Sequence, residues 1–217
     1  MHIEKLAAEI SAKDADIEAF TDGVLRDGQL REAVLDLLFS RSEIMIYYHC
    51  YYIIDAASGR MPGLFYDRFD EFAALLDHKN SYHRDIGLSV IANLSAADTG
   101  GKTAELLGRY AGHLRDSKFM TAQCCVRGLG RIAAQRPELA PRIAGLLTGA
   151  GLPSDDCPYT EKQLALLGAG IIEAFEPLFP GSGFDAELTA FAEARLKSIS
   201  PKARKAAAAF LKRAAAG

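Results

Sequence analysis

The sequence contains no tryptophan, only four cysteines and no long hydrophobic run. A disulfide framework would need a denser set of cysteines in a shorter chain, so we expect reduced, buried thiols. The longest apolar-rich stretch, 44–57, contains His49 and Asp55 and is shorter than the roughly 18 residues of a membrane span. The first residues lack the basic-then-apolar pattern of a signal peptide. We therefore expect a soluble, cytoplasmic protein that makes no membrane contact.

An excess of charge of one sign is also missing. The chain has 25 basic and 28 acidic residues, for a net charge of −3, and 49% of its 217 residues are apolar. This composition excludes a disordered chain and fits a single folded domain over 1–217. A dedicated nucleic-acid binder would favour an excess of lysine and arginine, because each neutralised phosphate adds affinity.

Catalytic motifs are absent as well. The sequence contains no Gly-x-Ser-x-Gly, no His-Glu-x-x-His and no dinucleotide fingerprint. Gly100-Gly101-Lys102-Thr103 is similar to the end of a phosphate loop, but the glycine required five residues before Gly101 is Ala96. We interpret this segment as a loop followed by a helix start. The sequence assigns no catalytic and no cofactor-binding residue.

The histidines offer no metal site. His78 and His83 are five residues apart, and His113 would approach them if neighbouring helical units stack. Zinc requires three or four converging ligands, and no ligand spacing of that kind is present. We expect these side chains to make surface or inter-unit hydrogen bonds, and we assign no metal ligand.

Almost every segment has the spacing of a helix, with apolar residues three and four positions apart, and no alternating strand pattern occurs. Ser40 with Glu43, and Thr160 with Gln163, fit capping boxes, which satisfy two free amides at a helix start. Ser200 before Pro201 is typical of a further helix start. The sequence predicts an all-α fold.

Four segments repeat one pattern, beginning at His83, Thr121, Glu161 and Ala203, so that they are 38, 40 and 42 residues apart. Small residues occupy matching places in each and would let neighbouring helices approach closely. Helices are expected before three of these segments, over 63–77, 103–116 and 185–198. The chain is therefore predicted to consist of helical pairs with a period near 40 residues.

These units resemble HEAT repeats. The resemblance rests on Leu75-Leu76-Asp77-His78-Lys79-Asn80-Ser81-Tyr82-His83-Arg84, on Leu129-Gly130-Arg131-Ile132-Ala133 and on Ala203-Arg204-Lys205-Ala206-Ala207-Ala208. It implies a right-handed α-solenoid of about four to five helical pairs. Capping helices would occupy 1–26, the paired repeats 28–198, and a basic terminal helix 199–214. By the family pattern, Asp77 and Arg84 would make structural contacts between units.

Two groups of residues are candidate contact sites. The tyrosines of the first circle a predicted helix and cannot all face one core, so some would present an aromatic surface to a partner: Tyr47, Tyr48, Tyr51 and Tyr52. The second group follows from the C-terminal stretch 193–217, which has seven basic residues and one acidic residue. Its candidate contacts for phosphates or an acidic partner are Lys202, Arg204, Lys205, Lys212 and Arg213. A polar outer face on a terminal repeat explains the same charges.

The leading hypothesis is a non-catalytic interaction or scaffold protein that binds a protein partner on a concave surface. Nucleic-acid binding or DNA repair is the alternative, because HEAT-like repair glycosylases hold DNA in a basic groove. A third hypothesis follows from the resemblance alone, since similar repeats occur in bilin lyases.

Overall fold

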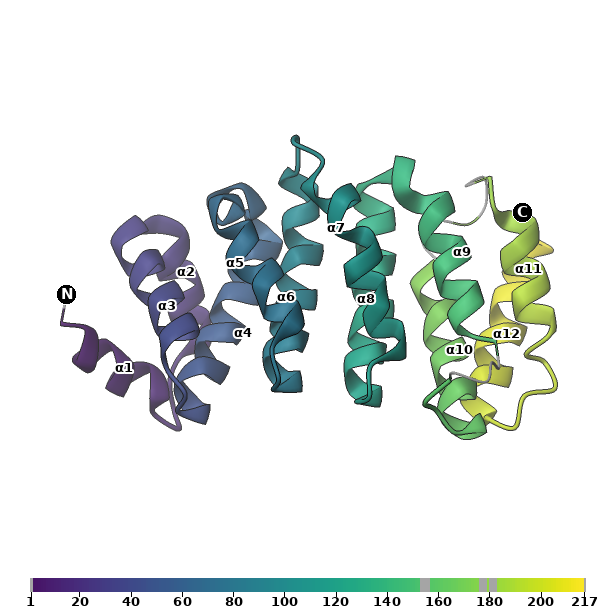
Figure 1. The fold of residues 1–217 in the computed structure, drawn as a ribbon, viewed down its shortest axis with the longest axis horizontal. Coiled ribbons are helices and arrows are strands. Elements are labelled where there is room, and N and C mark those ends of the chain that lie inside the picture. The colour runs from purple at the N-terminus through teal and green to yellow at the C-terminus, as the bar shows by residue number, and fades with distance from the viewer. Residues whose placement is uncertain (1, 153–156, 176–178, 180–182, 217) are drawn as a thin grey trace.

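The helices of this chain lie side by side in two rows. The computed structural model describes residues 2–152, 157–175, 179 and 183–216, and these residues form helices and no strand. The prediction of an all-α chain is thus confirmed for the described residues. From α3 and α4 onward, each odd-numbered helix packs on the even-numbered helix that follows it in the chain, and the two form a pair (Figure 1).

The α-helices of the described residues are α1 (Ile3–Ser11), α2 (Ile17–Arg26), α3 (Gly28–Ser40), α4 (Ile44–Arg60), α5 (Phe69–Ala74), α6 (Ser81–Leu94), α7 (Lys102–Ala111), α8 (Phe119–Gln135), α9 (Ala140–Ala150), α10 (Glu161–Phe175), α11 (Asp185–Glu193) and α12 (Pro201–Ala214). Short 3₁₀ turns join or extend them at Pro62–Leu64, Tyr66–Arg68, Leu75–Asp77, Ser95–Ala97, Gly112–Arg115 and Pro137–Leu139.

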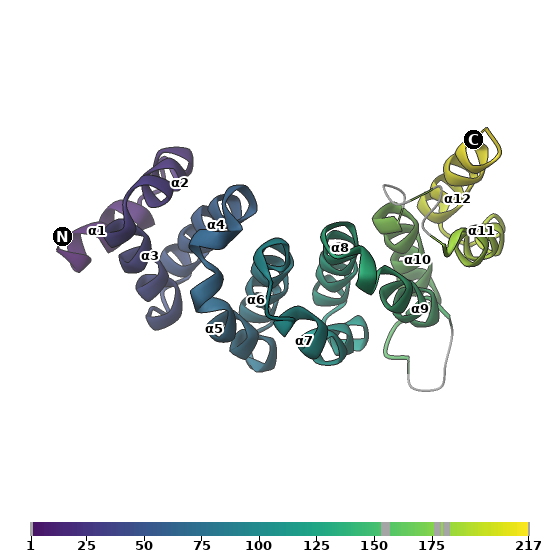
Figure 2. The same ribbon diagram turned by 90° about the horizontal axis from the view of Figure 1, so that it is seen from above.

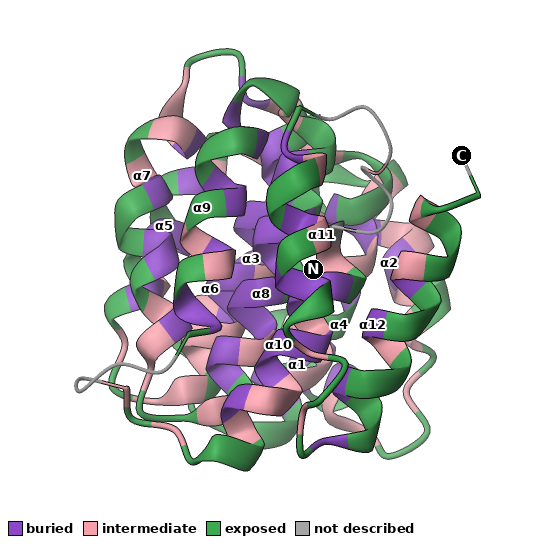
Figure 3. Cartoon of the chain, turned by 90° about the vertical axis from the view of Figure 1, so that its right-hand side faces the viewer, coloured by how far each residue is buried: buried purple, intermediate pink, exposed green. Residues whose placement is uncertain are grey.

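The two rows form a curved double layer. Seen from above, α2, α4, α6, α8, α10 and α12 follow the inside of the curve, and α3, α5, α7, α9 and α11 follow the outside (Figure 2). Within the inner row, α4 packs on α6, α6 on α8, α8 on α10, and α10 on α12. The buried side chains lie between the rows, with exposed residues on both outer surfaces (Figure 3). The four repeated segments of the sequence all fall in this inner row, in α6, α8, α10 and α12.

Helix starts agree with the sequence prediction at two of three places. Gln163 N donates to Thr160 Oγ1 (3.3 Å) and Thr160 N donates to Gln163 Oε1 (2.9 Å), so this capping box is confirmed. Ser200 accepts from the Ala203 amide before Pro201. The box at Ser40 and Glu43 is wrong, because α3 continues to Ser40 and Glu43 itself precedes α4 without a side-chain cap.

Hydrogen bonds between inner helices recur at a spacing of 38 residues. Asn93 of α6 donates from Nδ2 to Asp55 Oδ1 of α4 (3.1 Å), and its Oδ1 accepts from Arg131 Nη1 of α8. Asp55, Asn93 and Arg131 thus occupy equivalent places on three successive helices, and we call this set the polar ladder. It fixes the register of the three helices along their axes.

A buried ion pair joins the start of α6 to the segment that precedes α8. Arg84, at the start of α6, donates from Nε and Nη2 to Asp116, at distances of 2.8 and 2.7 Å, and its Nη1 donates to the carbonyl oxygen of His78. Burial alone would raise the pKa of Asp116, but hydrogen bonds from Arg84, the Lys118 amide and His113 outweigh it and the pKa is lowered. Arg84 thus makes the expected contact between units, and Asp77 pairs with Arg109.

The segment that is similar to a phosphate loop is organised by an internal carboxylate. Asp98 accepts hydrogen bonds from the amides of Gly101 (2.9 Å) and Thr103 (2.7 Å) at the start of α7, and Gly101 there has a positive φ of 82°. The carboxylate also accepts from Tyr66 Oη (2.5 Å) and pairs with Arg136 (3.1 Å). The amides that would hold a phosphate are therefore already occupied, which supports the loop interpretation.

Glycine allows the inner helices to pack closely at α8. A Cβ atom built on Gly128 would lie 1.8 Å from Tyr110 Oη, which is buried and donates to the Leu88 carbonyl oxygen (2.7 Å). A Cβ on Gly130 would lie 2.7 Å from the Cβ of Ala174 on α10. The small residues noted in the sequence are thus the places where neighbouring elements touch.

We expect Gly128→Ala to lower the free energy of unfolding by about 1–3 kcal/mol, because the added methyl must displace the Tyr110 ring from its hydrogen bond. Urea unfolding followed by circular dichroism measures the effect. Gly145→Ala is the matched control, since it is also in a helix but its Cβ would meet nothing within 4 Å. Equal stability of Gly128→Ala and wild type would contradict the packing argument.

Candidate functional site

A pocket opens on the inner side of the curve, between α4, α6 and α8. It encloses about 350 Å³, and all its walls come from these three helices. Its lining residues are Tyr48, Tyr51, Tyr52, Tyr82, Asp85, Ile86, Ser89, Met120, Cys124 and Arg127. We call this the tyrosine pocket. The three helices that form it follow the inside of the curve (Figure 2).

Four tyrosine rings form one wall of the pocket. Tyr48 packs edge-to-face on Tyr52, with ring centroids 5.1 Å apart, and on Tyr82 of the neighbouring helix at 5.9 Å. The ring centroids of Tyr51 and Tyr52 are 5.4 Å apart. Tyr52 and Tyr82 are 45% and 53% exposed, so their rings are available to a ligand. Large exposed aromatic rings are typical of binding surfaces.

The floor of the pocket is polar and internally bonded. Tyr51 Oη donates to Ser89 Oγ (3.2 Å), Ser89 Oγ lies 3.5 Å from Cys124 Sγ, and Cys124 Sγ donates to the carbonyl oxygen of Asp85 (3.6 Å). This chain of contacts connects all three helices beneath the rings. It holds the floor in place before any ligand arrives.

Asp85 is a half-buried carboxylate that faces the Thr121 hydroxyl. Its Oδ1 and that hydroxyl are both buried, and the hydrogen bond between the two side chains acts to lower the pKa of Asp85. Burial outweighs this bond and the charges of Arg84 and Arg127, so the pKa is raised. Arg127 is exposed on the pocket wall, and within the described part of the chain it forms no ion pair shorter than 4.0 Å. The pocket therefore holds one half-buried carboxylate close to aromatic rings.

Burial changes the titration of the Cys124 thiol and of the Tyr51 hydroxyl in this pocket. Burial raises the pKa of Cys124, so the thiol remains protonated and is a poor nucleophile. The pKa of Tyr51 is also raised by burial, and that of Tyr48 by its hydrogen bond with Tyr52.

The structure divides the four tyrosines predicted as partner contacts. Tyr48, Tyr51 and Tyr52 line the pocket, but Tyr47 is only 4% exposed and lies in the core, with its ring 4.9 Å from that of His83. Tyr47 is therefore not available to a partner, because its side of α4 faces the neighbouring helix. Of the four tyrosines predicted as partner contacts, Tyr48, Tyr51 and Tyr52 therefore remain candidates.

Sequence reasoning missed the pocket residues on α6 and α8. The 38-residue spacing would have found several of them. Adding 38 to the number of Tyr51 gives Ser89, and adding 38 again gives Arg127; in the same way Tyr48 gives Ile86 and then Cys124. Tyr82 and Met120 are related in the same way. The pocket is thus built from equivalent positions on three consecutive inner helices.

The basic residues predicted as contacts lie on α12 and are exposed: Lys202, Arg204, Lys205, Lys212 and Arg213. Lys202 and Arg204 make contacts within the fold. Lys202 pairs with Glu173 of α10 (3.1 Å), and Arg204 Nη1 donates to the carbonyl oxygens of Ser198 and Ile199. Part of this basic charge therefore stabilises the last helix.

The remaining candidate groups have local explanations. His113 Nδ1 bonds to Asp116 (3.0 Å), and the rings of His78 and His83 pack in a tilted arrangement with their centroids 4.2 Å apart. Among the residues that the structure describes, no three His, Cys, Asp or Glu side chains converge as metal ligands. Cys50, Cys124 and Cys125 are free, buried thiols, as expected, whereas Cys157 is half-buried. In the described helices, none has the length and apolarity to span a membrane.

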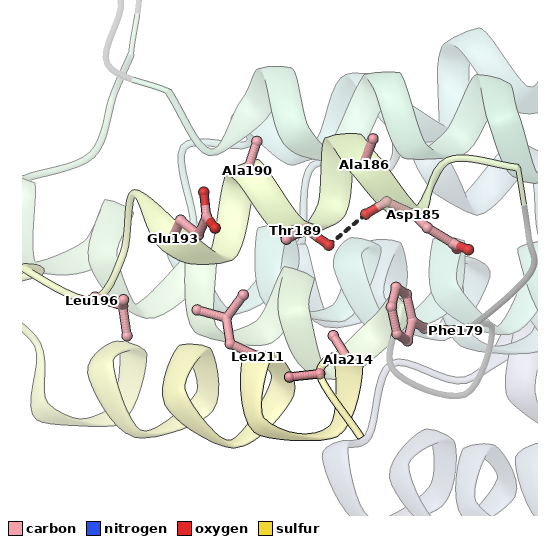
Figure 4. A pocket seen from close by; sticks show the side chains of 10 residues that line it. Phe179, Asp185, Ala186, Thr189, Ala190, Glu193, Leu196, Leu211 and Ala214 are labelled. Carbon is pink, nitrogen blue, oxygen red and sulfur yellow. Dashed lines mark hydrogen bonds between the residues drawn. The ribbon is translucent and has the colours of Figure 1, made fainter. Parts of the chain in front are cut away.

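A second hollow, of about 660 Å³, lies where the rows end, between α11 and α12. Figure 4 shows that its walls are mainly small apolar side chains, including Ala186, Ala190 and Leu211. The Thr189 hydroxyl donates to the carbonyl oxygen of Asp185 in its own helix (2.7 Å; Figure 4). This hollow is the open side of the last helical pair.

Comparison with known proteins adds no family to this description. No protein-family model matches the chain, and no curated protein matches it either.

Proposed function

We propose that this protein is a non-catalytic interaction protein of the HEAT-repeat type, a right-handed α-solenoid that binds a protein partner on its concave surface. The observation that carries the proposal is the tyrosine pocket, which combines exposed rings and a fixed polar floor on the inside of the curve. Recurring contacts at 38 residues, such as the polar ladder, support the repeat interpretation. The protonated Cys124 supports binding over catalysis.

The test is co-purification of the tagged protein from its native host, with and without nuclease, followed by mass spectrometry. We expect a stoichiometric protein partner that survives nuclease. The double variant Tyr52→Ala/Tyr82→Ala should weaken that complex about tenfold or more, because exposed tyrosines at the centre of an interface contribute strongly. Met61→Ala is the matched control, since Met61 is 49% exposed and does not line the pocket.

Two results would overturn the proposal. One is the absence of any protein partner that survives nuclease. The other is a nucleic-acid partner whose binding falls steeply with salt and on charge reversal at Lys202, Arg204 and Lys205. Either outcome would place this protein in another functional class.

A further inference from the structure

The tyrosine pocket has the chemistry of a cation site. Aromatic rings carry negative charge on their faces and attract a cation that lies within about 6 Å of the ring centre. Four tyrosine rings line this pocket: Tyr48 meets Tyr52 and Tyr82 edge-to-face, and the rings of Tyr52 and Tyr82 are 45% and 53% exposed. A cation in the pocket would meet these exposed rings.

The carboxylate of Asp85 adds a specific acceptor. The Thr121 hydroxyl supplies one hydrogen bond to this carboxylate, which can accept several, and most strongly from a donor that carries a positive charge. Ser89 and Cys124 add none, because their hydrogen bonds go to one another and to the Asp85 backbone. Asp85 lines the pocket and therefore retains the capacity to accept from a cationic ligand there.

Arg127 does not occupy the acceptor either. It is exposed and forms no ion pair shorter than 4.0 Å with Asp85 or any other acid among residues 2–152, 157–175, 179 and 183–216. Water screens an exposed charge more strongly than a buried one. The arginine thus reduces the attraction of the pocket for a cation without filling the site.

We propose that the tyrosine pocket binds a basic side chain of the protein partner, with the tyrosine rings around the cation and Asp85 as its hydrogen-bond acceptor. The proposal rests on the proposed function and names the chemistry of the partner at that same site. A basic side chain fits because it presents several N–H donors at the end of a flexible stem, which can reach an acceptor beneath exposed rings.

The first test uses two small probes, Nα-acetyl-arginine amide and its neutral isostere Nα-acetyl-citrulline amide. Binding is followed by two-dimensional NMR of the full-length protein and by tyrosine fluorescence, which no tryptophan obscures. We expect the arginine probe to shift amide signals of α4, α6 and α8, and to bind about tenfold more tightly than the citrulline probe. Equal binding of both probes, or shifts confined to other helices, would overturn the proposal.

Four variants then resolve the contributions to arginine-probe binding. Asp85→Asn should weaken it about tenfold, whereas Asp67→Asn, an exposed acid outside the pocket, should not. Tyr52→Phe should retain binding because the ring remains, and Tyr52→Leu should weaken it about threefold or more. An unchanged affinity in both Asp85→Asn and Tyr52→Leu would contradict the proposal. Circular dichroism confirms that each variant is folded.

Arg127→Gln tests whether the ligand of the pocket carries a positive or a negative charge. Removing this positive charge should strengthen binding of the arginine probe, whereas it would weaken binding of an anionic ligand such as an oligonucleotide. A weakened arginine probe in this variant would count against a cation site.

The two proposals can fail separately. If the wild type captures a protein partner and Asp85→Asn retains it undiminished, the cation site is wrong and partner binding stands. If the wild type captures no partner, the proposed function fails whatever the variant does.

Discussion

Replacing Asp98 by alanine is expected to lower the free energy of unfolding by about 3–5 kcal/mol, the cost of breaking a buried, hydrogen-bonded ion pair from one side. The substitution removes the acceptor for the amides at the start of α7 and for the Tyr66 hydroxyl. It also removes the carboxylate that pairs with Arg136, which keeps its bonds to the Asp98 carbonyl oxygen and to Glu138. Urea unfolding at neutral pH measures the loss, and a change below about 1 kcal/mol would contradict the buried-pair argument.

Two further measurements separate the contributions of Asp98. Asp98→Asn keeps one oxygen acceptor, so we expect a smaller loss of about 1–3 kcal/mol. In Asp98→Ala the freed amides form a vacant anion site at a helix start, so inorganic phosphate should stabilise this variant more than the wild type. The same stabilisation by phosphate in both proteins would show that the amides are not freed.

Asp98 also predicts a loss of stability in acid. Burial alone would raise its pKa, but the hydrogen bonds from Tyr66, Thr103 and Gly101 outweigh it and hold the pKa well below the usual value. A depressed pKa contributes stability above the pKa of the unfolded chain, about 3.9, and this contribution is lost as the pH falls toward the folded value. The stability of Asp98→Ala should therefore fall less steeply below about pH 4 than that of the wild type.

Arg84→Met is the second substitution with a large expected effect, again about 3–5 kcal/mol. It removes the guanidinium that makes two short bonds to Asp116 and a third to the His78 carbonyl oxygen, and it leaves the carboxylate buried. Urea unfolding of Arg84→Met, Asp116→Asn and the double variant measures the coupling between the two residues. Additive losses would show that the pair does not act as a unit.

Arg60→Met is the matched control for Arg84. Arg60 pairs with Glu18 across helices at 2.7 Å, but both side chains are exposed. Solvent screens such a pair, so we expect no measurable change in the urea midpoint. A loss equal to that of Arg84→Met would mean that burial is not the cause of the difference.

The sequence predicted the helical pairs because small residues and apolar positions recur at a nearly constant spacing. The starts at Thr160 and Ser200 were also visible, since each cap uses residues three positions apart. The box at Ser40 was misplaced, because α3 continues to Ser40, so this residue ends one helix instead of preceding the next. Local patterns thus located the elements more reliably than their ends.

The pocket was only partly visible in the sequence. The tyrosines of α4 stand next to one another, so they could be noticed. Tyr82 and Asp85 belong to another helix, and only the contact between units brings them to Tyr48 and Tyr51. Whether a tyrosine of α4 faces the core or the tyrosine pocket depends on how the helix is rotated about its own axis relative to its neighbours. That rotation is a property of the packing, which explains why Tyr47 could not be separated from the others.

The polar ladder also limits how the array can be lengthened. A carboxylate only accepts hydrogen bonds, a guanidinium only donates them, and an amide does both. Asp55 therefore begins the chain of bonds, Asn93 continues it, and Arg131 ends it. A duplicated helical pair could be inserted next to α6 without breaking the chain only if it carried, at this place, a side chain that both donates and accepts, such as asparagine or glutamine. The direction of its hydrogen bonds thus distinguishes the two end positions of the ladder, on α4 and α8, from the internal position on α6.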